Sequence, residues 1–126
     1  MLNNMNSVII EGNLVDDPEV KNTPNGTAVC AFAIASNRYY KANNETEKET
    51  SFLNIEAWSK LAENCGAYLK KGRGVRVVGR IKQDRWVDQQ GKHASRLKIV
   101  ADHIDFMPGK KPAENQEGGK KEELVF

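Results

Sequence analysis

The chain of 126 residues is poor in cysteine and proline, with two and four, and it contains no long apolar run. A membrane-spanning helix needs roughly 18 apolar residues in succession, and residues 1–6 lack the basic and apolar segments of a signal peptide. We therefore expect a cytoplasmic protein without membrane contact. Cys30 and Cys65 have no CxxC neighbour and no histidine-rich run nearby. We predict two reduced core thiols and no metal site.

Signatures of catalysis are also missing. His93 lies in a turn-like stretch and His103 follows Asp102, but no Ser or Cys nucleophile stands in a recognisable elbow. The sequence has neither an HExxH motif nor a glycine loop of the kind that binds phosphate. We predict that the chain is not an enzyme and needs no cofactor.

Composition separates a domain from a tail. Residues 110–121 contain no Val, Ile, Leu, Phe, Tyr or Trp, so they cannot bury enough apolar surface to offset the entropy lost on ordering. We predict one domain over residues 1–108 and a disordered tail over residues 109–126. The tail ends in an acidic and apolar tip, which is unusual for a disordered segment: Glu122, Glu123, Leu124, Val125 and Phe126.

Short runs rich in β-branched and aromatic residues dominate the domain. They cover residues 8–14, 29–34, 52–58, 75–81 with 85–87, and 96–100. Between the third and fourth runs, residues 61, 65, 68 and 69 are apolar at helical spacing, with Ser59 as the expected N-cap and Lys70, Lys71 and Gly72 as the expected end. This order predicts an all-β fold: a five-stranded barrel with one helix between strands three and four.

The net charge of +2 hides an uneven distribution. The balance of charge is −4 over residues 1–59 and +8 over residues 60–100. Arg76, Arg80 and Lys82 share parity in one run, as do Arg96 and Lys98 in another, so alternation places each set on one face of its strand. Such a charge run is commonly a solvated face, but it is also the footprint of a surface that follows phosphates.

The aromatic residues favour the second interpretation. Phe32, Tyr68 and Phe106 have core-like spacing, and we expect them to pack inside. The other rings of the domain stand beside charged or polar residues: Tyr39, Tyr40, Phe52, Trp58 and Trp86. Any one of them is as compatible with burial as with exposure, but unpaired bases stack on rings that lie among cations. Together they predict a surface for single-stranded nucleic acid.

The sequence resembles the bacterial single-stranded DNA-binding proteins from about residue 5 to about residue 106. The resemblance is carried by the order and spacing of short segments at residues 5–14, 17–20, 24–29, 60–72, 78–81 and 86–92. It implies a five-stranded OB barrel, a homotetramer formed through the early strands, and association with the nucleoid. It also implies that the chain coats single strands in DNA replication, recombination and repair.

The resemblance assigns individual stacking residues. Trp86 stands where the family has a tryptophan, Trp58 where it often has phenylalanine, and Phe52 where many members have tryptophan. A further aromatic of the family corresponds to either Tyr39 or Tyr40. The resemblance does not distinguish the two, because the expected loop over residues 41–50 varies in length in the family. That loop and a hairpin over residues 83–95 would be flexible fingers over the strand. The phosphate contacts, assigned more from charge parity, are Arg38, Arg76, Arg80, Arg85 and Arg96.

The tip at residues 122–126 resembles the family's tail end, which recruits replication and repair enzymes, although it lacks the family's aspartates and proline. A terminal Phe126 fits an apolar pocket while the adjacent carboxylates meet basic residues. An alternative function for the whole chain is an OB barrel that binds RNA or serves as a primosome or recombination adaptor, because the fold alone does not decide.

Overall fold

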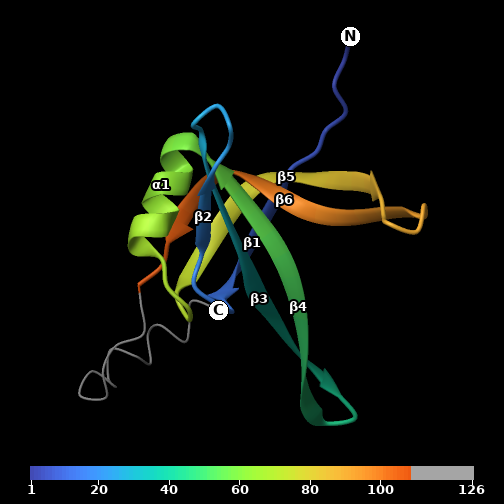
Figure 1. Ribbon diagram of the computed structural model, residues 1–126. Coiled ribbons are helices and arrows are strands. Elements are labelled where there is room, and N and C mark those ends of the chain that lie inside the picture. The colour runs from blue at the N-terminus through green and yellow to red at the C-terminus, as the bar shows by residue number, and fades with distance from the viewer. Residues whose placement is uncertain (109–126) are drawn as a thin grey trace.

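Six strands and one helix form the part of the chain that the structure describes, residues 1–108 of a computed structural model (Figure 1). The predicted tail and its tip lie outside the described residues. The helix is neither long nor apolar enough to cross a membrane. In chain order the elements are β1 (Val8–Leu14), β2 (Glu19–Asn22), β3 (Ala28–Ala42), β4 (Glu45–Trp58), α1 (Ser59–Tyr68), β5 (Gly74–Val87) and β6 (His93–Phe106).

Five of the strands close into a barrel. Their order is β1-β5-β6-β4-β3, and β3 returns to β1 through the pairs Asn13–Ala35 and Leu14–Ile34. Strands β4 and β6 run parallel, whereas every other pairing in residues 1–108 is antiparallel. The predicted OB barrel is therefore confirmed, with α1 between its third and fourth strands. The sequence missed β2, whose four residues are all exposed and show no apolar alternation.

The core is built from the inward-facing residues of the strands and from α1. Alternate residues of the barrel strands, such as Ile34, Ile55 and Val77, are buried, and Ala62, Cys65 and Leu69 cover them from the helix side. Both cysteines are free and buried, as predicted. A hydrogen bond with the Cys30 thiol and burial both raise the pKa of Cys65. Phe32 is buried and Phe106 packs against the core, as expected.

Two glycines allow strands to approach closely where the barrel closes. A Cβ atom on Gly12 would lie 2.6 Å from the carbonyl oxygen of Ala35. On Gly79, next to the irregular register of β5 and β6, it would lie still closer to the carbonyl oxygen of Val100. Real Cβ atoms do not tolerate either approach, so both positions require glycine.

The helix departs from expectation at both ends. Ser59 is its first residue, with φ of 60°. Trp58 occupies the N-cap position, and its side chain makes no capping hydrogen bond to the first turn of the helix. The helix ends at Tyr68, before the two lysines that were expected in its last turn. Tyr68, expected in the core, is instead 64% exposed, because Leu69 takes the inward position. The predicted burial of Tyr68 and the predicted cap at Ser59 were therefore wrong.

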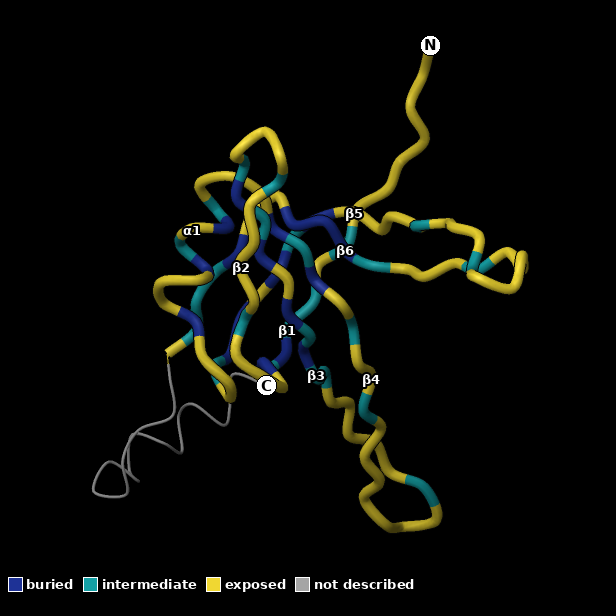
Figure 2. The backbone as a smooth tube through the Cα atoms, in the orientation of Figure 1, coloured by how far each residue is buried: buried dark blue, intermediate teal, exposed yellow. Residues whose placement is uncertain are grey.

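Two hairpins extend beyond the barrel as arms, and their residues are mostly exposed (Figures 1 and 2). In the β3–β4 arm the pairing continues to Ala42 and Glu45, and Asn43 and Asn44 make the turn with φ of 54° and 65°. Asn tolerates this left-handed conformation better than most residues. The predicted loop over residues 41–50 was wrong, because it consists of paired strands and this tight turn. The predicted hairpin over residues 83–95 is confirmed as the β5–β6 arm.

Candidate nucleic-acid interface

The pairing of β3 with β4 decides which aromatic side chains share a face. Phe52 and Trp58 both point away from the barrel interior, since the residues next to them, Leu53 and Ala57, point inward. Phe52 pairs with Ala35, which places the odd-numbered residues of β3 on the same outer face. Tyr39 therefore lies on this face.

Tyr40 pairs with Glu47 and lies on the opposite face of the arm. Of the two tyrosines between which the sequence left the choice open, Tyr39 is therefore the one that shares a face with Phe52. Arg38 also lies on the Tyr40 side. Its guanidinium stands 5.0 Å from the centre of the Tyr40 ring, and its Nη1 lies 3.5 Å from Oε1 of Glu49.

The β5–β6 arm continues the same outer surface. Strand β4 joins β6 through the pair Ile55–Ile99, whose side chains both point into the core. The even-numbered residues of β5, and those of β6 up to Lys98, therefore face outward with Phe52, and Trp86 is one of them. Further along β6 the irregular register at Val78 and Gly79 reverses the alternation, so that Ile104 points into the core. We call this surface the stacking face, and the exposed fractions of its four rings are 60% for Tyr39, 69% for Phe52, 42% for Trp58 and 46% for Trp86.

The arginines expected to contact phosphate are distributed unequally around this face. Arg96 lies on the stacking face, across from Asp84. Arg80 is also directed outward, and it pairs loosely with Asp102 at 3.8 Å. Arg85 alternates with Trp86 and points to the other side of the arm, where its Nη2 donates to Oε1 of Gln83 at 3.0 Å.

Arg76 is remote from Trp86 along the same strand. It lies on β5 well before Trp86, and the rise of about 3.3 Å per residue puts roughly 30 Å of strand between them. Its Nε and Nη2 lie 2.7 Å and 2.6 Å from Oε2 of Glu11. Its charge is thus matched within the protein. Arg80 and Arg96 lie on the outer face with the rings, whereas Arg38 and Arg85 point to the other sides of their arms. Arg76 has the same outward parity as Arg80, but it is paired with Glu11 and lines a groove together with Ala35.

A chain of polar contacts crosses the floor of the stacking face. Trp58 Nε1 donates to Oε1 of Glu56 at 2.9 Å, and Lys98 Nζ lies 2.7 Å from Oε2 of Glu56. Lys98 Nζ also lies 2.8 Å from Asp84, which accepts from Lys82 Nζ at 2.8 Å. The sequence did not reveal this chain, because it depends on the parallel pairing of β4 with β6.

These contacts shift two pKa values. Hydrogen bonds from Lys82 and Lys98 lower the pKa of Asp84 to about 2. Burial of the Lys98 ammonium acts in the opposite sense to its hydrogen bonds with Asp84 and Glu56, yet the net effect is a raised pKa for Lys98. Both groups are therefore charged at neutral pH, and Lys98 is neutralised inside the protein.

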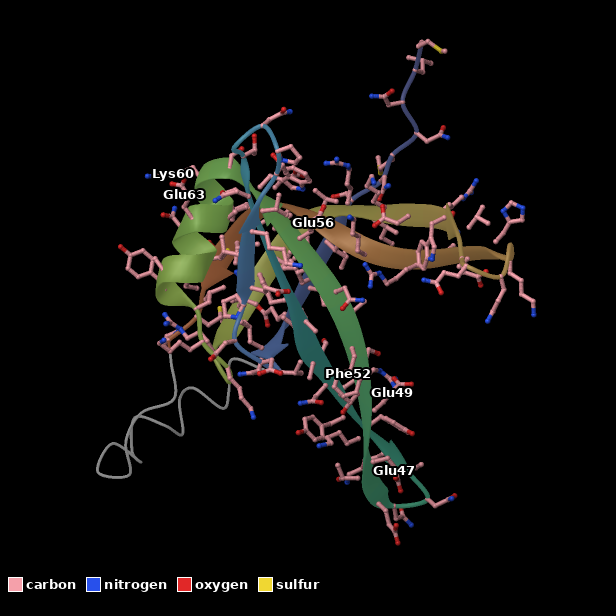
Figure 3. All side chains as sticks on the ribbon, viewed as in Figure 1. Glu47, Glu49, Phe52, Glu56, Lys60 and Glu63 are labelled. Atoms are coloured by element: carbon pink, nitrogen blue, oxygen red, sulfur yellow. The ribbon has the colours of Figure 1, made fainter. Side chains whose placement is uncertain are left out.

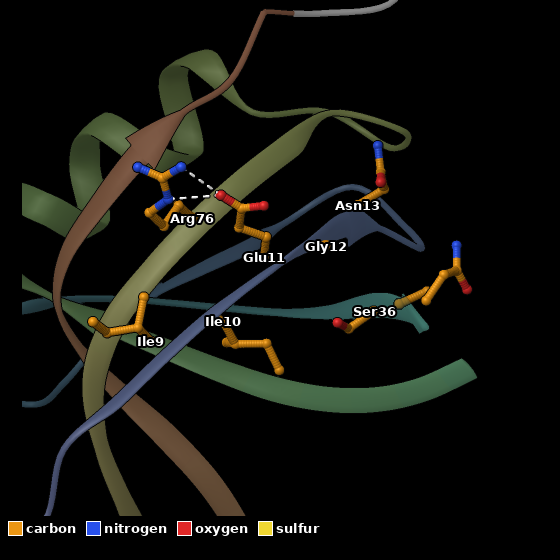
Figure 4. A pocket seen from close by; sticks show the side chains of 9 residues that line it. Ile9, Ile10, Glu11, Gly12, Asn13, Ser36 and Arg76 are labelled. Carbon is orange, nitrogen blue, oxygen red and sulfur yellow. Dashed lines mark hydrogen bonds and ion pairs between the residues drawn. The ribbon is translucent and has the colours of Figure 1, made fainter. Parts of the chain in front are cut away.

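A groove of about 410 Å³ lies beside β1, where β1 and β3 diverge (Figure 4). The pairing of β1 with β5 uses Val8 to Asn13, whereas β1 meets β3 only at Asn13 and Leu14. One edge of β1 is thus unpaired over most of its length within residues 1–108. Ile9 beside it is 69% exposed. An open strand edge is a ready template for pairing with another chain.

The N-terminal segment is held at the base of the β5–β6 arm. The side chain of Asn6 donates from Nδ2 to the carbonyl oxygen of Ile81 at 2.7 Å, and its Oδ1 accepts from the Ile81 amide at 2.9 Å. These two side-chain bonds tie the chain to β5 two positions beyond Val8–Gly79, the last pair of the β1–β5 ladder. In the described part of the chain, no three His, Cys, Asp or Glu side chains gather as metal ligands.

The closed five-stranded barrel, with exposed rings and cations on one outer face, defines a nucleic-acid-binding OB fold. Comparison with known families agrees with this geometry. The sequence matches the model of the Single-strand binding protein family over residues 5–107, and the chain belongs to that family.

Similar curated proteins carry the same description. The chain is 39% identical to the "Single-stranded DNA-binding protein" of Bacillus cereus over 114 residues, which is 90% of this chain and 66% of that protein. It is 36% identical to "Single-stranded DNA-binding protein A" of Bacillus subtilis over 118 residues, covering 94% and 68% of the two chains. It is 37% identical to "Single-stranded DNA-binding protein 2" of Listeria innocua, covering 87% and 69%. The chain thus spans about two thirds of the length of these relatives.

Proposed function

We propose that this protein binds and coats single-stranded DNA without sequence preference. Bases stack on Tyr39, Phe52, Trp58 and Trp86, while Arg80 and Arg96 neutralise phosphates beside them. The observation that carries the proposal is the gathering of four exposed rings on one outer face of a barrel of this family. Each stacked base contributes about 1 to 3 kcal/mol whatever its identity, which suits coating rather than reading of a sequence.

A tryptophan-quenching titration tests this function. Trp58 and Trp86 are the only tryptophans of the chain, and both lie on the stacking face. Oligo(dT) should quench their emission strongly, whereas duplex DNA of equal length should quench it weakly because its bases are already stacked. Stronger quenching by oligo(rU) than by oligo(dT) would favour the RNA-binding alternative. No quenching by either strand would favour an adaptor that binds protein.

The biological setting we propose is DNA replication, recombination and repair in the cytoplasm, in association with the nucleoid. The protein acts there by binding, not by catalysis. We further propose that it assembles as a homotetramer, with the open edge of β1 and the exposed Ile9 as one contact between copies. Light scattering should give four times the mass of one chain, and substitution of Ile9 by Lys should lower that mass.

We also propose that the tip at residues 122–126 recruits replication and repair proteins. Its support is the sequence alone: two glutamates and a terminal carboxylate around three apolar residues. Removal of these five residues should leave affinity for oligo(dT) intact while helicases, nucleases or polymerase subunits no longer co-purify. Retention of such partners by the shortened chain would contradict this role.

A further inference from the structure

Trp58 differs from a freely exposed stacking ring because its indole edge is anchored. Its Nε1 donates to Oε1 of Glu56 at 2.9 Å, while the residue as a whole remains 42% exposed. Both residues are on β4 and point outward, two positions apart. The hydrogen bond therefore fixes the rotation of the ring relative to the sheet.

Glu56 is itself held at its other oxygen. Lys98 Nζ lies 2.7 Å from Oε2, and the side chains of Lys98 and Glu56 are only 13% and 18% exposed. Asp84 holds Lys98 from the far side at 2.8 Å. Each oxygen of Glu56 thus has its own donor, and the carboxylate cannot turn without breaking one of the two contacts. Figure 3 shows Glu56 where β4 reaches the base of the β5–β6 arm.

We propose that Glu56 is a positioning residue for strand binding: it holds the Trp58 ring in the orientation that receives a base. This inference rests on the proposed function. Ordering the ring before DNA arrives removes part of the entropy cost of binding. Because the indole N–H is already occupied, Trp58 offers a base its π face and no free donor, which is the sequence-tolerant mode of contact.

Charge alone makes the opposite prediction for this residue. A carboxylate on a surface that meets phosphates repels them, so its removal should tighten binding if it acts only through charge. If Glu56 acts by positioning Trp58, its removal should weaken binding. The sign of the effect therefore separates the two roles.

Glu47 provides the matched control. It lies on the same strand, on the opposite face of the arm, and makes no ion pair or side-chain hydrogen bond within residues 1–108 (Figure 3). We expect Glu56→Ala to weaken the affinity for dye-labelled oligo(dT) about three- to tenfold, because the Trp58 side chain must then be ordered when the strand binds. Glu47→Ala should leave the affinity unchanged or raise it. Equal or tighter binding by Glu56→Ala would overturn the proposal.

A second pair of variants tests whether Glu56 acts through the indole N–H. Trp58→Phe keeps a ring but has no N–H, so adding Glu56→Ala to it should change the affinity by less than about twofold. Glu56→Gln keeps one acceptor oxygen for two donors, the indole N–H and the Lys98 ammonium, so it should restore part of the affinity that Glu56→Ala removes. If Glu56→Ala weakens binding equally in the Trp58→Phe background, Glu56 acts by another route.

Fluorescence without DNA gives an independent readout. In a Trp86→Phe background, Trp58 is the only emitter, and Glu56→Ala should shift its emission to longer wavelength and lower its anisotropy, whereas Glu47→Ala should not. Unchanged emission in a chain that still binds oligo(dT) overturns the positioning role alone. Failure of the unmutated chain to bind oligo(dT) overturns the proposed function as well. Thermal unfolding confirms that each variant is folded, and Glu56→Leu, which also lacks an acceptor for the indole, carries the test if Glu56→Ala is not.

Discussion

The two faces of the β3–β4 arm carry opposite charge although the same two strands build both. On the stacking face, Tyr39 lies among Lys41 and Lys48. On the other face, which we call the acidic face, lie Arg38, Tyr40, Glu45, Glu47 and Glu49. Composition alone describes this half of the chain as acidic. Strand register, and not composition, therefore decides on which face of the arm a polyanion can lie.

The largest effect should come from removing rings of the stacking face. Phe52→Ala together with Trp86→Ala deletes two stacking platforms worth about 1 to 3 kcal/mol each. We expect the affinity for oligo(dT) to fall roughly thirtyfold or more, measured by anisotropy of a labelled strand. A loss within a factor of two would remove stacking on this face as the mechanism.

Two neighbouring tyrosines, Tyr39 and Tyr40, test which face of the β3–β4 arm binds the strand. Tyr39→Ala should weaken binding about tenfold, since it removes one stacked base. Tyr40→Ala is the matched control and should change the affinity less than about twofold, because the Tyr40 ring lies on the acidic face beside Arg38. The reverse order of effects would place the strand on the acidic face.

A smaller effect is expected from the charges of the two faces. Lys48 pairs with Tyr39 across the arm, so Lys48→Gln should leave one phosphate of the bound strand without its cation. The slope of log K against log salt should become shallower by about 0.7 for each phosphate of a single strand that the protein no longer neutralises. Glu47→Gln should leave the slope as it is. An unchanged slope in Lys48→Gln would take this lysine off the strand path.

The smallest expected effect concerns the chain of polar contacts on the stacking face, in which Asp84 is paired with Lys82 and Lys98. The pKa of Asp84 is lowered from 3.8 to about 2, so the folded state favours the ionised form. Its contribution to stability is therefore complete above about pH 4 and is lost as the pH falls toward 2. The Tm difference between the unmutated chain and Asp84→Asn should shrink over that interval.

The sequence predicted the barrel and the helix because their signals are local. Alternation of apolar residues marks the barrel strands, and helical spacing marks α1. The arms were harder to predict because both faces are exposed, so that residues 41–50 show no apolar alternation and were predicted as a loop. Tyr68 follows Cys65 at helical spacing, yet the helix ends there and Leu69 fills the core position instead.

The candidate site was predictable as a set of residue types but not as a surface. Interleaved rings and cations indicated five candidates, Tyr39, Tyr40, Phe52, Trp58 and Trp86, of which all but Tyr40 lie on the stacking face. Their common face depends on pairing between strands distant in sequence, and so does the assignment of Arg38 to the acidic face. The contact of Glu56 with Lys98 depends on the parallel pairing of β4 and β6, which no local pattern shows, whereas Glu56 and Trp58 are two positions apart on β4.

Photocrosslinking tests the central claim, that one strand lies on the stacking face, most directly. An iodine-substituted oligo(dU) bound to the unmutated chain is irradiated, and the attached residues are identified by mass spectrometry. We expect crosslinks at Tyr39, Phe52, Trp58 and Trp86. Crosslinks concentrated at Tyr40 or at Tyr68, with none on the stacking face, would contradict it.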